Sequence, residues 1–94
     1  MLTWDEAITI GCKKYRELYP KGTIPPELEE QGGLGSNSEG SLVIVHVTYW
    51  FEGESEPFYL FRASVNRESG DVCVTNAEDW HVLEGRTFDN SQSL

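Results

Sequence analysis

Basic residues are scarce in this sequence of 94 residues. It contains seven Lys and Arg against sixteen Asp and Glu, so its formal net charge is −9. Proteins that bind DNA, RNA or an anionic membrane neutralise phosphate groups with clusters of Lys and Arg. The sequence has no such cluster. The composition therefore argues against direct binding to nucleic acid or to a membrane, and it favours a basic protein partner.

Cysteines and long apolar runs are scarce too. Small secreted scaffolds usually carry several disulfide pairs, whereas this chain has two cysteines, Cys12 and Cys73. Its longest apolar-rich run, residues 42–51, is too short to span a bilayer. The first residues lack the basic and apolar regions of a signal peptide. These features predict a cytoplasmic protein whose two cysteines are reduced and buried.

The side chains that metal binding and nucleophilic catalysis require are also few. The two cysteines and the two histidines, His46 and His81, form no Cys-x-x-Cys motif and no histidine pair on one helix face. The glycine-rich stretch 32–36 lacks the Gly-Lys-Ser/Thr ending of a phosphate-binding loop. We expect no metal, no cofactor and no enzymatic activity. The enzyme alternative is a nucleophilic pair of Cys73 with His46 or His81.

A capping box at the start of the chain predicts a helix. The Thr3 hydroxyl can accept a hydrogen bond from the Glu6 amide, and the Glu6 carboxylate can accept one from the Thr3 amide. Apolar residues then recur at helical spacing until Pro20 stops the helix. The predicted helix covers residues 3–19. We expect Gly11, on its apolar face, to let a sheet approach closely.

The rest of the chain predicts a meander of strands. Residues 20–40 have no lasting period and many breakers, so they are expected to be a long acidic connection with one helical turn near residues 27–31. Alternating apolar residues predict strands over residues 41–52, 57–67 and 71–76. Residues 80–84 fit a fourth edge strand or a short helix, and we favour the strand. Residues 85–94 are expected to fray.

These elements predict a single α+β domain with one amphipathic helix packed on a three- to four-stranded antiparallel sheet. The sheet face toward the helix would carry Val43, Val45, Val47, Tyr49 and Phe51 from one strand and Tyr59, Phe61, Ala63 and Val65 from the next. The other face would include Ile44, His46, Trp50, Leu60 and Arg62. Because it is rich in apolar residues, it is expected either to bind a partner or to be covered by the connection or the tail.

Two stretches resemble a known kind of domain. Residues 2–7, Leu-Thr-Trp-Asp-Glu-Ala, and residues 61–72, Phe-Arg-Ala-Ser-Val-Asn-Arg-Glu-Ser-Gly-Asp-Val, resemble the small PepSY-like and cystatin-like α+β domains of bacterial immunity proteins. In those families a strand enters an Asp-x-x-Thr-Gly-Glu-Val turn and returns as the next strand. Here Asn66, Ser69 and Asp71 stand in place of the usual Asp, Thr and Glu. The resemblance implies a protein that binds and blocks a toxin.

The negative charge is concentrated in the middle of the chain. Residues 27–60 contain seven glutamates and neither Lys nor Arg, so this segment has a charge of −7. Aromatic residues interrupt the acidic stretch, and rings within a carboxylate rim suit recognition of a basic protein. The residues predicted to bind a partner are Glu27, Glu29, Glu30, Glu39, Trp50, Glu52, Glu54, Glu56 and Phe58. The alternative is an acidic surface that serves solubility alone.

Three hypotheses about function follow. The first is a non-enzymatic inhibitor that binds and blocks a basic functional surface of a toxin, as an immunity protein does. The second is a phage-encoded anti-CRISPR protein or another nucleic-acid mimic that inhibits a nuclease complex. The third is an adaptor module that forms homodimers or larger homo-oligomers through the open sheet face.

Overall fold

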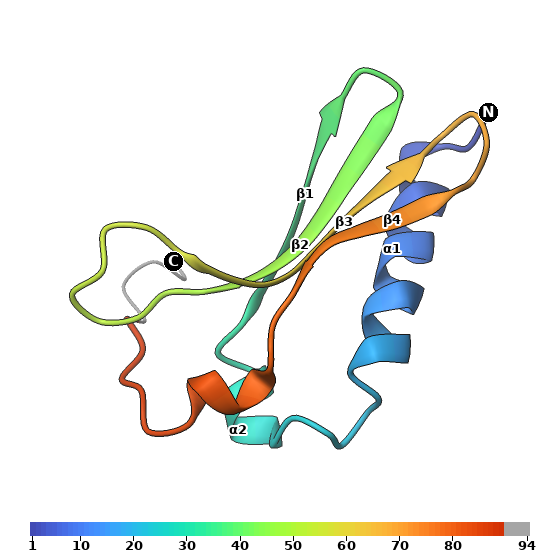
Figure 1. Ribbon diagram of the computed structural model, residues 1–94. Helices are drawn as coiled ribbons and strands as arrows, with labels where there is room; N and C mark the ends of the chain where they lie inside the picture. The colour runs from blue at the N-terminus through green and yellow to red at the C-terminus, as the bar shows by residue number, and fades with distance from the viewer. Residues whose placement is uncertain (90–94) are drawn as a thin grey trace.

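An N-terminal helix lies across one face of a four-stranded antiparallel sheet in the computed structural model, which describes residues 1–89 (Figure 1). The helix is α1 (Trp4–Leu18), and the strands, adjacent in chain order, are β1 (Gly33–Glu39), β2 (Leu42–Tyr49), β3 (Phe58–Asn66) and β4 (Val72–Ala77). A short helix, α2 (Pro26–Glu29), and a 3-10 helix, η1 (Trp80–Leu83), complete the described elements. The predicted α+β fold is confirmed. No helix in this part of the chain is long and apolar enough to cross a membrane.

The capping box forms as predicted at the start of α1. The Glu6 amide donates to Thr3 Oγ1 at 3.1 Å, and the Thr3 amide donates to Glu6 Oε1 at 2.9 Å. Together these bonds satisfy two amides that the first turn leaves without helical partners. The buried stripe of the helix consists of Ala7, Gly11 and Tyr15. Local sequence signals therefore place α1 correctly.

The expectation of an irregular connection over residues 20–40 is wrong. Its one predicted helical turn overlaps α2, but residues 33–39 form β1, which pairs with β2 from Gly33 opposite Thr48 to Glu39 opposite Leu42. Six of the seven residues of β1 are exposed. Its sequence, Gly-Leu-Gly-Ser-Asn-Ser-Glu, has neither the apolar alternation nor the β-branched residues that indicate a strand. It is a strand because β2 provides a hydrogen-bonding edge beside it.

The predicted strand over residues 80–84 is also wrong. This stretch is η1. The Asp79 side chain caps it by accepting a hydrogen bond from the His81 amide, and Leu83 within it is fully buried. The fourth strand of the sheet is supplied by β1 instead.

The chain after η1 does not fray in its described part. Phe88 forms an isolated antiparallel bridge with Phe51, and the Glu52 amide donates to the Thr87 carbonyl at 2.8 Å. Residues 90–94, the rest of the predicted frayed tail, lie outside the described residues. An apolar ring in a polar segment thus attaches residues 85–89 to the loop after β2.

The inward face of β2 is as predicted, but that of β3 is not. All five predicted inward residues from Val43 to Phe51 are at most 7% exposed. On β3, however, Tyr59 is 41% exposed and Leu60 is fully buried. The register with β2 shifts here, because Val47 pairs with Phe61 and Thr48 with Tyr59. Leu60 is the extra residue, and such a bulge reverses the alternation of side chains beyond it.

Candidate protein-binding surfaces

The seven glutamates of the acidic segment lie in three separate places. Glu27, Glu29 and Glu30 are on or just after α2, Glu39 ends β1, and Glu52, Glu54 and Glu56 are in the loop between β2 and β3. Glu39 pairs with the first residue of β2, whereas the loop follows the last, so they lie at opposite ends of this strand (Figure 1). The residues predicted to bind a partner therefore do not form one continuous surface.

The loop between β2 and β3 extends beyond the end of the sheet (Figure 1). Its three glutamates, Glu52, Glu54 and Glu56, are all exposed. Glu54 lies 4.0 Å from the Arg86 guanidinium, while Glu52 and Glu56 have no ion pair within residues 1–89. The loop thus keeps most of its charge available to a partner.

Aromatic side chains line the inner side of this loop. The ring centroids of Phe51 and Phe58 are 5.5 Å apart, and Arg86 Cζ lies 3.8 Å from the Phe51 centroid, in a cation–π contact. A hollow of about 320 Å³ is lined by Phe51, Glu54, Glu56, Pro57, Phe58 and Arg86. The loop therefore places carboxylates directly beside aromatic surface, as the sequence predicts for this part of the site.

The predicted aromatic anchors differ in how much surface they offer. Trp50 and Phe58 are half-buried, so part of each side chain is accessible. Tyr49 and Phe51, the neighbours of Trp50 in the sequence, are 0% and 5% exposed and belong to the core. A partner can therefore contact Trp50 and Phe58, while the other two rings support the loop from below.

Sequence reasoning missed the segment that holds this loop. The Asp89 amide donates to the Trp50 carbonyl at 2.8 Å, which adds to the bond between Glu52 and Thr87. The Phe88 ring packs at 5.8 Å from Tyr49 and 5.6 Å from Phe51. The sequence does contain an indication of this contact, because Phe88 is the one Phe, Tyr or Trp after Trp80 and stands in an otherwise polar segment.

One of the three glutamates near α2, Glu29, lines a second hollow. Glu29 forms an ion pair of 2.9 Å with Arg16, and the hydrogen bond in this pair raises the pKa of the guanidinium further above its usual value. Glu27 and Glu30 are exposed and have no ion pair within the described chain. The hollow, of about 290 Å³, is lined by Cys12, Tyr15, Arg16, Glu29, Gly32, Leu34 and Val47.

The sheet face opposite α1 is not covered by the connection, because residues 33–39 extend the sheet as β1. On this face Arg62 lies 3.6 Å from Glu39, and the rings of His46 and Tyr59 meet edge to face at 5.6 Å. Burial, and secondarily the charge of Arg62, lowers the pKa of His46. Gly35 faces the imidazole so closely that a Cβ there would lie 2.4 Å from His46 Cε1.

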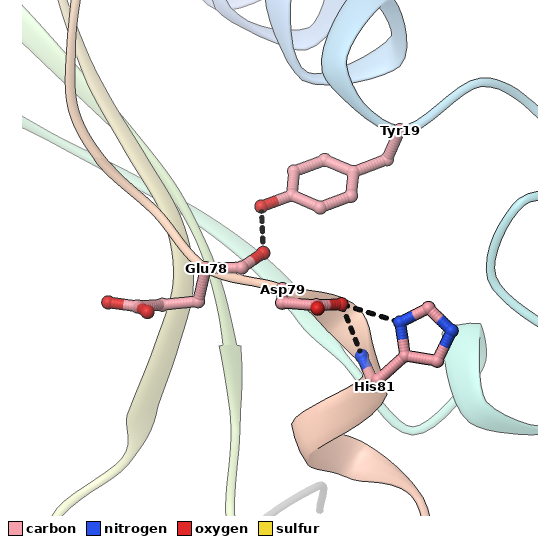
Figure 2. A network of polar contacts seen from close by, with 4 residues as sticks. All are labelled: Tyr19, Glu78, Asp79 and His81. Atoms are coloured by element: carbon pink, nitrogen blue, oxygen red, sulfur yellow. Dashed lines mark hydrogen bonds and ion pairs between the residues drawn. The ribbon is translucent and has the colours of Figure 1, made fainter.

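A hydrogen bond joins the residue after α1, Tyr19, to Glu78, the residue after β4 (Figure 2). The Tyr19 hydroxyl donates to the Glu78 carbonyl at 2.6 Å and lies 3.2 Å from the Leu60 carbonyl. Nearby, Asp79 Oδ1 accepts from the backbone amide of His81 at 3.0 Å and lies 2.6 Å from its Nδ1 (Figure 2). These hydrogen bonds lower the pKa of Asp79. Tyr19 thus holds the segment between β4 and η1, and Asp79 caps η1.

The enzyme alternative needs a cysteine next to a histidine. Cys73 is exposed on β4, opposite Ser64 of β3, and Cys12 is only partly buried, so the expectation that both cysteines are buried is wrong. His46 belongs to β2. Within residues 1–89, no hydrogen bond connects Cys73 to His46 or to His81. No group of three or more His, Cys, Asp or Glu in this range could hold a metal ion.

Three comparisons of the chain, with protein-family models, with curated proteins and with solved structures, find no match.

Proposed function

We propose that this protein is a non-enzymatic inhibitor that binds a basic functional surface of a partner protein through its β2–β3 loop and thereby blocks it. The observation that carries the proposal is the group of three exposed glutamates, Glu52, Glu54 and Glu56, of which Glu54 and Glu56 line one hollow with the half-buried ring of Phe58. Trp50, also half-buried, lies two residues before Glu52 in the chain. The resemblance to immunity proteins supports a toxin as the partner, and the inhibitor would then act in the cytoplasm.

Charge and aromatic surface have different roles in such a complex. Residues 50–57 carry three glutamates and no base, and residues 84–89 carry two acids and one base, so this end of the molecule has a charge of −4. A field of this sign accelerates encounter with a basic partner. Burial of aromatic rings then slows dissociation.

The loop is held at its base, which favours binding. Backbone hydrogen bonds join Trp50 to Asp89 and Glu52 to Thr87, and the Phe88 ring packs on the loop residue Phe51. A loop that is ordered before it binds loses less conformational entropy in the complex.

A charge-reversal experiment tests the proposal. The loop variant carries Glu52→Lys, Glu54→Lys and Glu56→Lys, and the matched control carries Glu17→Lys, Glu68→Lys and Glu78→Lys, at exposed positions elsewhere. Each substitution adds two positive charges, so both variants change from −9 to −3. The partner is first isolated from the native cell with the unmodified protein, and its association rate is then measured at several salt concentrations.

We expect the loop variant to bind at least about tenfold more slowly than the control, with a weaker salt dependence. Equal association rates for the two variants, or an unchanged salt dependence for the loop variant, would show that the loop does not steer binding. Inhibition of the partner's activity is measured in parallel, because binding without inhibition would contradict the inhibitor proposal.

The same surface suits a second class of target, a nuclease complex whose basic groove normally holds nucleic acid. Exposed carboxylates can occupy such a groove as phosphates do. Competition distinguishes the two: added nucleic acid would displace the protein from a nuclease groove and would not displace it from a toxin that binds no nucleic acid.

The homo-oligomeric alternative rests on the sheet face with Ile44, His46 and Tyr59. Ile44 is only 5% exposed, and Arg62 on this face is paired with Glu39. The mass of the protein in solution tests this alternative: a stable dimer that Trp50→Ala converts to a monomer would favour it over the inhibitor.

A further inference from the structure

The outer edge of β1 is open. β1 pairs with β2 along all seven of its residues, and it is the first strand in the sheet order β1-β2-β3-β4. Within residues 1–89 no strand pairs with its other edge. Along that edge, amide and carbonyl groups face outward at alternate residues and can pair with a further strand.

β1 lacks most of the features that usually protect an edge strand, and its one charged residue, Glu39, stands at its end. Natural edges are blocked by Lys, by Pro, or by a bulge that twists the strand away. The β1 sequence Gly-Leu-Gly-Ser-Asn-Ser-Glu contains neither residue, and its pairing with β2 has no register shift. At the opposite edge, by contrast, the pairing of β4 with β3 shifts between Arg62 and Ala63. The two edges of this sheet are therefore not equivalent.

A hollow with mainly apolar lining lies next to this open edge, and the Arg16–Glu29 ion pair forms part of its wall. Leu34 of β1 is 60% exposed, and it lines the hollow of about 290 Å³ together with Val47 of β2 and Tyr15 of α1. α1 packs mainly on β2 and β3, so it does not fill the space over β1. A side chain of an added strand can lie beside Leu34 and enter this hollow.

Acidic residues lie at both ends of β1. Glu27 and Glu30 of the α2 region precede the strand, and Glu39 ends it. A second copy of this chain fits the edge poorly. An antiparallel pair of β1 strands centred on Ser36 would place Glu39 of each copy beside Gly33 of the other, near the same α2 acids. A basic segment meets no such repulsion.

We propose that β1 accepts an extended segment of a protein partner as a fifth strand of the sheet. This segment carries an apolar side chain that enters the hollow beside Leu34, and Lys or Arg residues that face Glu27 and Glu30 at one end and Glu39 at the other. Backbone hydrogen bonds supply affinity in this mode of binding, and the side-chain pocket supplies specificity. The site does not involve the β2–β3 loop, so it stands or falls separately from the proposed function.

The probe is a blocked synthetic peptide, Lys-Thr-Lys-Val-Leu-Val-Lys-Thr-Lys, and two control peptides replace either every Lys by Glu or the central Leu by Ser. Hydrogen exchange of single amides is followed by NMR. We expect the probe to slow exchange in residues 33–39 and to leave residues 72–77, the opposite edge, unchanged. Both control peptides should bind at least about tenfold more weakly.

Protein variants complete the test. Leu34→Lys, at an exposed position, and the pair Glu27→Lys with Glu30→Lys should each weaken probe binding about tenfold, whereas Glu78→Lys near the opposite edge should not. The variant with three lysines in the β2–β3 loop should bind the probe as the unmodified protein does. Absence of protection in residues 33–39, or equal binding by Leu34→Lys, would overturn the proposal. So would a dimer in solution whose β1 amides are already protected without the probe.

Discussion

Gly11 of α1 lies so close to Val45 of β2 that a Cβ atom on the glycine would be 2.6 Å from Val45 Cγ2 and 2.9 Å from Val45 Cβ. Carbon atoms that are not bonded do not approach to this distance without displacement. The glycine therefore sets how closely the helix and the sheet pack. The expectation that Gly11 allows close approach is confirmed.

Gly11→Ala should destabilise the protein although alanine favours helix. The helix propensity gained is about 1 kcal/mol, while overpacking of a core costs about 1–3 kcal/mol. We expect urea unfolding to show a net loss of about 1 kcal/mol. The loss should be smaller when Val45→Ala is already present. A more stable Gly11→Ala protein would contradict the close contact.

Tyr19 should couple stability to alkaline pH. Burial, as the main cause, raises the pKa of Tyr19 to about 12. A tyrosine whose pKa is raised in the folded state favours folding while it is protonated. Its contribution is therefore complete below pH 10, the ordinary pKa, and is lost as the pH rises toward 12.

Tyr19→Phe removes this contribution together with the hydrogen bonds to Glu78 and Leu60. We expect the free energy of unfolding to fall by about 1–2 kcal/mol at pH 8. The difference from the unmodified protein should shrink between pH 10 and pH 12, as measured by urea unfolding at each pH. Tyr59→Phe, at an exposed ring, is the control and should change little. A difference that stays constant to pH 12 would contradict this role for Tyr19.

Tyr49 carries a buried hydroxyl that has no hydrogen-bond partner within residues 1–89. Burial raises the pKa of Tyr49 above its ordinary range. Because an unpaired buried hydroxyl costs free energy, Tyr49→Phe should stabilise the protein by about 1 kcal/mol in urea unfolding. A loss of stability would mean that a bound water or another group pairs with this hydroxyl.

Gly32→Ala should destabilise the protein, because an added Cβ would collide with the Tyr49 ring. A Cβ on Gly32 would lie 2.7 Å from Tyr49 Cζ and 2.9 Å from its hydroxyl oxygen, and the ring is fully buried. We expect a loss of about 1–3 kcal/mol in urea unfolding. Gly33→Ala is the matched control, because the nearest atom to its added Cβ would be Thr48 Oγ1 at 3.9 Å. Equal stability of the two variants would contradict the contact between Gly32 and Tyr49.

The capping box should make the stability of the protein depend on pH in the acidic range. The hydrogen bond from the Thr3 amide is the main cause that lowers the pKa of Glu6. A carboxylate with a lowered folded pKa favours folding above its ordinary value of 4.5, and this contribution is lost as the pH falls through the folded pKa. Glu6→Gln should therefore lower the melting temperature at pH 7 more than at pH 3. Glu17→Gln, on the same helix but outside the box, is the control for the loss of one negative charge.

Local patterns were enough to predict α1 and the hairpin of β2 and β3. The capping box, the helical spacing of apolar residues and the strict alternation in β2 each depend on neighbours in the chain. Tyr59 and Leu60 show the limit of such patterns. Their exposure depends on a bulge, and a bulge is a property of the pairing between two strands.

The candidate site was predictable in part. Glu52, Glu54 and Glu56 are close in sequence, so their common position in one loop follows directly. The separation of Glu39 from this loop does not, because it depends on where β1 begins and ends. Arg86 reaches the loop only through the fold, since it lies more than thirty residues from Phe51 in the chain.

The amino-acid sequence alone established a small acidic α+β protein, its capped helix, its central hairpin and the stretch that carries most of its charge. Those features depend on composition and on contacts between residues close in the chain. The fold assigned residues 33–39 to a strand, attached Phe88 to Phe51 and divided the acidic residues among separate surfaces. The bridge between Phe88 and Phe51 joins residues distant in the chain. β1 pairs with β2 across the turn at Gly40 and Ser41, although its own residues have little strand propensity, so it depends on the edge that β2 offers. Local propensity therefore predicts neither feature.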